Sequence, residues 1–447
     1  MPKTFGKHAI IIGAGMGGLT AAKALSSFFD QVTVLERDAL PAKAEPRIGT
    51  PHCHQLHVLL RGGLDALNDF FPSFETELQK AGAVRLRVGS DMLVEAPGFD
   101  PFPQRDLGID SLSMTRPLIE RVVRRCVERE PNIAFRTGCR ATQLLASADG
   151  TAVTGVRYDQ ASGGSEEIAG DLVVDASSRG TLTMELLDRL ELPHPEQIEI
   201  GVDLAYATAI FRIPRNAPRS WRAVFHRPSA ASGRGGFLFP IEDHCWHAGL
   251  NGMHGDAPSD QRDEFIAFAA SLRTPTIHDA IKDAELVGTI HRFNLPASVR
   301  RRFETLQQFP ARLLVIGDAI CRFNPAYGQG MTVAVQEALV LKDLLAARAR
   351  EGEGLDGVAA AYFQAIQGVL AAPWAVAETD FIYGKTRGPC PRDFQSRMQY
   401  SAALQKVAAQ DAAVHRTVAE VNHLLKPHSA LREPEIVKKV EAVLAAV

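Results

Sequence analysis

The sequence has few cysteines, little net charge and no long apolar run, and each shortage excludes a class of protein. Six cysteines in 447 residues, with no Cys-x-x-Cys pair, exclude a disulfide-rich scaffold and dithiol redox chemistry. Lys plus Arg number 49 and Asp plus Glu number 52, and this net charge of −3 argues against a nucleic-acid-binding protein. No stretch approaches the roughly 18 apolar residues of a transmembrane helix. No apolar signal region precedes the first expected strand, so we expect a cytoplasmic protein.

Motifs of several catalytic classes are also missing. The sequence holds no Gly-x-Ser-x-Gly elbow, which removes the nucleophile of an α/β-hydrolase. Two clusters contain residue types that bind zinc in other proteins, namely His52, Cys53, His54 and His57, and then His244, Cys245 and His247. Neither cluster has paired Cys-x-x-Cys or His-Glu-x-x-His spacing, so we expect no metal site.

The first forty residues have the order strand, glycine-rich turn, helix, strand, acidic residue. His8–Ile12 and Gln31–Leu35 are short apolar runs of the kind that form strands buried on both faces of a parallel sheet. Between them lie the glycine-rich residues 13–18 and a stretch of good helix formers. This order is that of a dinucleotide-binding unit, in which the N-terminus of the helix holds a diphosphate.

Each residue type in this unit has a physical task. Gly13 permits the tight turn, Gly15 lets the backbone approach a pyrophosphate, and Gly18 lets the helix pack closely on the strand. Glu36 ends the second strand about 20 residues after the turn, where its carboxylate can accept from ribose hydroxyls. An acid at this place argues against NADP and leaves NAD and FAD open. The cofactor-binding candidates of this unit are Gly13, Ala14, Gly15, Gly18, Glu36 and Arg37.

A later segment decides between these cofactors. Arg312–Ile316 is another apolar strand that ends in Gly317-Asp318, and the chain runs on through residues 323–331 into a helix-forming stretch. This arrangement resembles the flavoprotein monooxygenases of the aromatic-hydroxylase superfamily, which bind FAD. The resemblance implies that Asp318 binds a ribityl hydroxyl, that a helix N-terminus stabilises the reduced flavin, and that Pro325 walls its C4a face. The flavin candidates here are Asp318, Pro325, Gly328, Gly330 and Met331.

The similarity is closest to one branch of that superfamily, the bacterial flavin-dependent epoxidases and hydroxylases that include polyether epoxidases. It is carried by Phe323-Asn-Pro-x-Tyr-Gly-Gln-Gly-Met-Thr and by the segment that begins Pro51-His52-Cys-His54-Gln. The resemblance implies that Arg116 and Ala141 lie beside the cofactor. It also makes His52, His54 and His57 candidates for a flavin-side or substrate-side wall, with a covalent histidyl-flavin bond as an alternative.

The chain is therefore predicted to be an α/β protein with a Rossmann-like FAD-binding domain of the aromatic-hydroxylase type, an inserted antiparallel β-sheet substrate domain and a helical C-terminal region. We expect the FAD-binding domain from residues 1–83, 111–198 and 285–349, the substrate domain from 84–110 and 199–284, and the helical region from 350–447. Its helices are expected over Gly357–Val369, Tyr400–Leu425 and Glu433–Val447, with breaks at Pro373 and Pro391. We interpret these helices as a packed lid, with a membrane-surface element as the alternative.

The resemblance implies an FAD-dependent monooxygenase. Such an enzyme inserts one oxygen atom from O₂ into a lipophilic or aromatic small molecule, by hydroxylation or alkene epoxidation, through a flavin C4a-hydroperoxide. NAD(P)H is the expected electron donor, either directly or through a partner flavin reductase.

One segment departs from the superfamily pattern. After the strand Asp171–Asp175, Ser177-Ser178 stands where the superfamily has Asp-Gly, a segment that supports nicotinamide use in the hydroxylases. This departure keeps open a separate reductase. It also keeps open a non-oxygenating flavoprotein, either a double-bond reductase or a redox-neutral cyclase or isomerase. The absence of a Trp-x-Trp-x-Ile-Pro segment argues against a halogenase.

Overall fold

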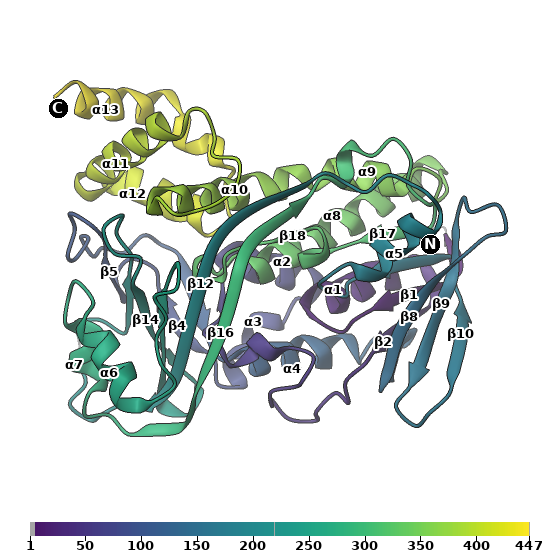
Figure 1. Ribbon diagram of the computed structural model, residues 1–447, viewed down its shortest axis with the longest axis horizontal. Coiled ribbons are helices and arrows are strands. Elements are labelled where there is room, and N and C mark those ends of the chain that lie inside the picture. The colour runs from purple at the N-terminus through teal and green to yellow at the C-terminus, as the bar shows by residue number, and fades with distance from the viewer. Residues whose placement is uncertain (1–4, 219, 447) are drawn as a thin grey trace.

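The computed structural model describes residues 5–218 and 220–446. A five-stranded parallel sheet lies on the right-hand side of the view in Figure 1. Its strand order is β17-β11-β1-β2-β7. In chain order these strands are β1 (Gly6–Ile12), β2 (Phe29–Glu36), β7 (Ile133–Thr137), β11 (Leu172–Asp175) and β17 (Leu313–Val315). The four strands predicted near residues 8–12, 31–35, 171–175 and 312–316 all lie in this sheet. Residues 1–4 and Val447, at the ends of the predicted regions, lie outside the described residues.

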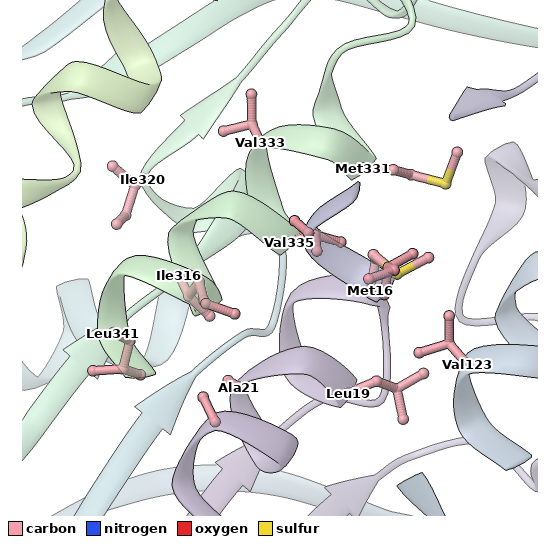
Figure 2. Packing of buried hydrophobic residues seen from close by; sticks show 14 of the residues in the cluster. Met16, Leu19, Ala21, Val123, Ile316, Ile320, Met331, Val333, Val335 and Leu341 are labelled. Atoms are coloured by element: carbon pink, nitrogen blue, oxygen red, sulfur yellow. The ribbon is translucent and has the colours of Figure 1, made fainter. Parts of the chain in front are cut away.

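The central strands of this sheet are apolar over the residues that are buried on both faces. Ile11 packs in the core that contains the helices α1 (Met16–Ser26), α4 (Arg116–Val127) and α8 (Gly330–Glu351). Its neighbours Ile10 and Ile12 pack in a second core on the opposite face. Figure 2 shows the helix side, where Val335 of α8 lies beside Met16 of α1 and Leu19 of α1 points toward Val123 of α4. The alternation of strand side chains thus serves two cores at once.

An antiparallel meander covers the second face. It consists of β8 (Cys139–Ala146), β9 (Val153–Gln160) and β10 (Ser165–Ala169), and the helix α5 (Thr181–Arg189) lies beside it. The apolar residues Val156 and Tyr158 of β9 pack against Ile10 of the parallel sheet. The meander lies at the edge of the molecule furthest from the C-terminal helices (Figure 1).

A seven-stranded sheet forms the other half of the molecule, with strand order β18-β16-β12-β15-β14-β13-β5. Its strands are β5 (Met92–Glu95), β12 (Gln197–Arg212), β13 (Ala223–His226), β14 (Gly235–Ile241), β15 (Cys245–Gly252), β16 (Leu286–Arg301) and β18 (Cys321–Arg322). The predicted β14–β15 hairpin across residues 241–243 is present. The long strands β12 and β16 cross the molecule from this sheet toward the parallel sheet (Figure 1).

By its hydrogen bonds β16 lies in the seven-stranded sheet, although the expected boundary at residue 285 places it with the flavin segments. The domain boundaries themselves stay a prediction. The remaining small elements are β3 (Val58–Leu59), β4 (Val84–Arg87) and β6 (Asp110–Ser113), which form a three-stranded sheet, and the helices α2 (Arg61–Phe70), α3 (Phe74–Lys80), α6 (Arg262–Ala270) and α7 (Thr276–Ile281).

The C-terminal region is helical, as expected, and its helices are interrupted around Pro391, but the predicted break at Pro373 is wrong and a break at Asp411 was not predicted. Its helices are α9 (Val358–Ala365), α10 (Gln367–Ala377), α11 (Phe394–Gln410), α12 (Ala412–Asn422) and α13 (Pro434–Ala445). Pro373 lies inside α10, where the buried neighbours Leu370 and Trp374 hold the helix in the core. The helix expected over Tyr400–Leu425 is divided at Asp411, whose carboxylate caps α12 by accepting from the N–H groups of Ala413 and Val414.

The end of α12 is attached to the flavin half of the molecule. The Gly62 N–H donates to the His423 carbonyl at 2.9 Å, and the Gln336 side chain of α8 donates to the Leu424 carbonyl at 3.0 Å. Within the described chain, no helix is both long and apolar enough to cross a membrane.

Candidate functional site

The first candidate group is the turn between β1 and α1. Gly13 has a φ of +100°, and its N–H donates to the Leu35 carbonyl at 2.8 Å. A Cβ on Gly18 would lie 1.9 Å from the Gly13 carbonyl oxygen, so only glycine allows this helix to approach the strand. A Cβ on Gly15 would meet nothing within 4 Å, and no side chain of the described residues caps α1 there. The N-terminus of α1 therefore offers open N–H groups to an anion.

Glu36 stands at the end of β2, beside this turn. Its side chain is buried, and its two oxygens accept from the N–H groups of Ala14 at 2.8 Å and Asp38 at 3.0 Å. An ionised carboxylate has about four acceptor positions, so capacity for ribose hydroxyls is left. The structure thus brings Ala14 and Glu36 together at the dinucleotide turn.

An arginine that the sequence analysis missed completes this corner. Arg47 contacts three carboxylates, with Nε 2.6 Å from Glu120 and Nη1 2.9 Å from Asp38 and 3.2 Å from Glu36. Burial disfavours its charge, but these carboxylates more than offset that effect and raise the pKa of Arg47. By contrast Arg37, the arginine named from the sequence, is exposed and donates to the Gly49 carbonyl.

Arg116 is the first residue of α4, one helical turn before Glu120. It is buried, its Nε lies 3.5 Å from a Glu120 oxygen, and this Nε has no hydrogen-bond partner among the described residues. It lines a cation-rich cavity between the 41–53 loop and α4, together with Lys43, Arg47, Arg121 and Arg124. A buried guanidinium with an unused donor beside other cations fits a site for a negatively charged group.

The segment after β17 carries the second acid. Burial raises the pKa of Asp318, while the charges of Arg322 and Arg116 act in the opposite direction. The backbone of this turn is held by Glu337 of α8, whose carboxylate accepts from the Gly317 N–H at 2.7 Å. Glu337 was not predicted, although a single acid inside the apolar stretch 331–341 is a usable signal.

The turn that leads into α8 contains the remaining flavin candidates. Pro325 opens the short 3₁₀ helix Pro325–Tyr327 and is exposed. Gly328 follows with a φ of +66°, and a Cβ there would lie 3.5 Å from Val58. Helix α8 begins at Gly330 without a side-chain cap from the described residues. Met331 lies next to it, near Met16 at the start of α1, so the uncapped ends of the two helices lie close together (Figure 2).

The predicted histidine wall lies between the residue 51–59 segment and the seven-stranded sheet. His54 stacks on His291 of β16 with ring centroids 3.8 Å apart, and His247 of β15 contacts the His54 carbonyl at 3.1 Å. His57 Nδ1 lies 2.8 Å from the Gln55 carbonyl, which can only accept, so Nδ1 carries the proton and Nε2 is a free acceptor. His52 lies 5.6 Å from His57 between ring centroids.

Burial disfavours the charged form of three of these histidines. Burial lowers the pKa of His52 and of His247 to about 4, and the pKa of His57 far below its usual value. Arg116 lowers the pKa of both His52 and His57 further, which places them on the Arg116 side of the wall. Ala141 of β8, the last candidate, packs beside the core that contains Leu35 and Ile12.

Comparison with known proteins agrees with this geometry. Residues 7–365 match the protein family described as FAD binding domain. The chain belongs to this FAD-binding family. The match confirms the predicted FAD-binding fold of the aromatic-hydroxylase type, and it supports FAD as the cofactor for which the two uncapped helices, Glu36 and Asp318 are suited.

Individual proteins are similar to this chain to different degrees. The chain is 31% identical over 349 residues to Protein Rv3254 of Mycobacterium tuberculosis, covering 76% of this chain and 73% of that protein. It is 23% identical over 337 residues to squalene monooxygenase 1,1 of Brassica napus, covering 75% of this chain and 62% of that protein. The crystal structure of p-nitrophenol 4-monooxygenase PnpA of Pseudomonas putida has the same fold, with a TM-score of 0.64 at 16% identity over 96% of this chain and 100% of that one.

Proposed function

We propose that this chain is an FAD-dependent monooxygenase that transfers one oxygen atom from O₂ to a lipophilic or aromatic small molecule, by hydroxylation or alkene epoxidation. The observation that carries the proposal is the meeting of two uncapped helix N-termini with Arg116 and Asp318 in a chain of the FAD-binding family. The similarity to a squalene monooxygenase supports oxygen transfer to an apolar substrate.

The residues of the site divide the binding of FAD between them. The N–H groups at the start of α1 hold the diphosphate, and Glu36 accepts from the adenosine ribose. Asp318 accepts from the ribityl chain, and the start of α8 places its N–H groups at the pyrimidine edge. Arg47 pairs with Glu36 and Glu120 and orients their carboxyl groups. Bound FAD supplies electron storage and the activation of O₂, so no acid–base pair is required of the protein.

Aromatic and aliphatic side chains gather on the proposed substrate side, with Arg227 over the Phe225 ring. The rings of Phe225 and Phe237 stack at 5.1 Å, and Phe237 packs beside Leu56 and Val58, next to the histidine segment. The neutral His57 presents an acceptor without adding a charge. Such a wall suits a lipophilic or aromatic molecule and keeps water away from the reacting atoms.

The electron donor is NAD(P)H, used directly or through a partner flavin reductase. Ser177 and Ser178 replace the acid-glycine pair, and the nearby Asp175 does not substitute for it. Asp175 is fully buried and accepts from the Ser177 N–H at 3.0 Å and the Thr183 hydroxyl at 2.6 Å, so it stabilises the start of α5. Because Asp175 is used within the protein and does not replace the acid-glycine pair, a second candidate function remains. It is a non-oxygenating flavoprotein, either a double-bond reductase or a redox-neutral cyclase or isomerase.

The experiment that separates these functions begins with the FAD-loaded protein under anaerobic conditions. NADH and NADPH are each added, and the reduction of the flavin is followed by its visible absorbance. Oxygen uptake is then measured with and without a set of lipophilic alkenes and phenols. A monooxygenase consumes O₂ in proportion to the oxygenated product, whereas either non-oxygenating function converts its substrate without net O₂ uptake.

A further inference from the structure

A fully buried carboxylate lies next to the flavin turn and comes from outside the region that matches the FAD-binding family. Asp380 belongs to the 3₁₀ helix Glu378–Tyr383, which follows α10, and its exposed fraction is 0%. The family match ends at residue 365. The role of Asp380 is therefore a property of this C-terminal region.

Asp380 holds both ends of the turn that contains Pro325. Its Oδ2 accepts from the Asn324 side chain at 3.0 Å, and its Oδ1 accepts from the Tyr327 hydroxyl at 2.5 Å. The amide of Asn324 is fixed in orientation because its Oδ1 accepts from the Ala326 N–H at 3.0 Å, which leaves its Nδ2 for Asp380. One side chain thus fixes the residues on either side of Pro325.

The surroundings of Asp380 do not favour a charge. Burial raises its pKa to about 6, although the hydrogen bonds from Asn324 and Tyr327 act in the opposite direction. The titratable groups that face it are the phenols of Tyr206, Tyr327 and Tyr383, and Arg227, the residue after β13, faces Tyr327 and Tyr383. No cation of the described residues forms an ion pair with Asp380. A buried carboxylate without a cation is retained here for the geometry that it imposes.

We propose that Asp380 is a positioning residue for the flavin, which acts by holding the turn of residues 324–328 in front of the N-terminus of α8. The proposal rests on the proposed placement of the flavin beside this turn. Through Asp380 the C-terminal helical region completes a site whose other walls come from the matched family region. Loss of this contact frees Pro325 and Gly328 to move away from the cofactor.

Variants at position 380 separate hydrogen bonding from charge. In D380N the amide oxygen accepts from Asn324 while the amide N–H donates to the Tyr327 oxygen, so both hydrogen bonds persist with the hydroxyl reversed. D380A removes both bonds, and Y327F removes one. D343A serves as the control because Asp343 is exposed on α8, the same helix that begins at this turn.

The measurement is a fluorescence titration of each apoprotein with FAD, together with the visible circular dichroism of the bound flavin. We expect D380A to weaken FAD binding by about tenfold or more and to change the flavin dichroism. Y327F loses roughly threefold, whereas D380N and D343A keep the affinity and the dichroism of the wild type. Urea unfolding of the apoproteins shows which variants are folded. If D380A does not fold, the test is made with Y327F.

Two results would overturn the proposal. One is wild-type affinity and dichroism in folded D380A and Y327F, and the other is a loss in D380N as large as in D380A. The variant D318A distinguishes this failure from that of the proposed function. Weakened FAD binding in D318A with no effect of D380A contradicts only the role of Asp380, whereas no effect in either variant contradicts the placement of the flavin itself.

Discussion

The Glu337 carboxylate accepts a hydrogen bond from the Gly317 N–H at 2.7 Å, and this contact joins α8 to the turn that presents Asp318. Glu337 is fully buried, and its other oxygen has no hydrogen-bond partner among the described residues. Two segments of the flavin site, the end of β17 and the start of α8, are thus held together by one buried acid. Its ionisation affects the stability of the apoprotein.

Glu337→Gln should make the apoprotein less sensitive to alkaline pH. Burial raises the pKa of Glu337 to about 8 from an ordinary value of 4.5. Because the pKa of this acid is raised, its contribution to stability is fully present below pH 4.5 and is lost as pH rises through 8, up to roughly 5 kcal/mol. Urea unfolding between pH 5 and 9 should show this loss in the wild type and not in the variant. The exposed Glu185→Gln variant should follow the wild type.

Asp318→Ala should weaken FAD binding by about ten- to a hundredfold, because a charge-assisted hydrogen bond contributes about 1.5–3 kcal/mol. Asp318 is the acid that the proposed binding of FAD assigns to the ribityl chain. Equilibrium dialysis of the variant against FAD measures the change. Asp263→Asn, at a fully exposed side chain of α6, is the matched control. Equal FAD retention in D318A and D263N would count against the assignment of Asp318.

The two arginines near Glu36 should respond differently to substitution. Arg47→Gln leaves Glu36, Asp38 and Glu120 without their shared cation and should destabilise the apoprotein by about 3–5 kcal/mol. Arg37→Gln removes an exposed side chain and should change stability by less than about 0.5 kcal/mol. Chemical denaturation of the two variants side by side tests this difference. Similar stability losses would show that the ion network is not centred on Arg47.

His247→Gln should reduce the acid sensitivity of the apoprotein. Burial lowers the pKa of His247 to about 4 from 6.5, so the stability of the neutral form is present above pH 6.5 and is lost as pH falls toward 4. The loss amounts to roughly 3 kcal/mol. A glutamine can still donate to the His54 carbonyl, the present partner of His247. Unfolding curves of the wild type and the variant at pH 4.5 and 7 measure this difference. The same pH dependence of stability in both proteins would contradict the prediction.

Local patterns predicted the parts of the fold that depend on neighbouring residues. The apolar run at His8–Ile12, the glycine turn and Glu36 lie within one βαβ unit, so their spacing indicated the structure and a dinucleotide as the class of ligand, with NAD and FAD both open. The hairpin across residues 241–243 was predicted for the same reason. Its two strands are joined by a short connection, and pairing follows from the sequence order.

Contacts between distant segments could not be predicted in this way. Arg47 joins Glu36 to Glu120, and Asp380 binds Asn324 and Tyr327, which lie more than fifty residues before it in the chain. No local periodicity of the sequence indicates these contacts. The expected helix end before Pro373 was wrong because burial of Trp374 and its neighbours outweighs the one backbone hydrogen bond that proline removes. Tertiary packing decided each of these cases.

The most direct test of the proposed function is a single turnover with isotopically labelled O₂. The FAD-loaded protein is reduced photochemically, which removes the question of its natural electron donor, and is then mixed with labelled O₂ and a lipophilic alkene or phenol. The account predicts that one labelled oxygen atom appears in the organic product for each reduced flavin that is reoxidised. Reoxidation that yields only labelled hydrogen peroxide across the set of substrates, or a product formed without label, would contradict the monooxygenase function.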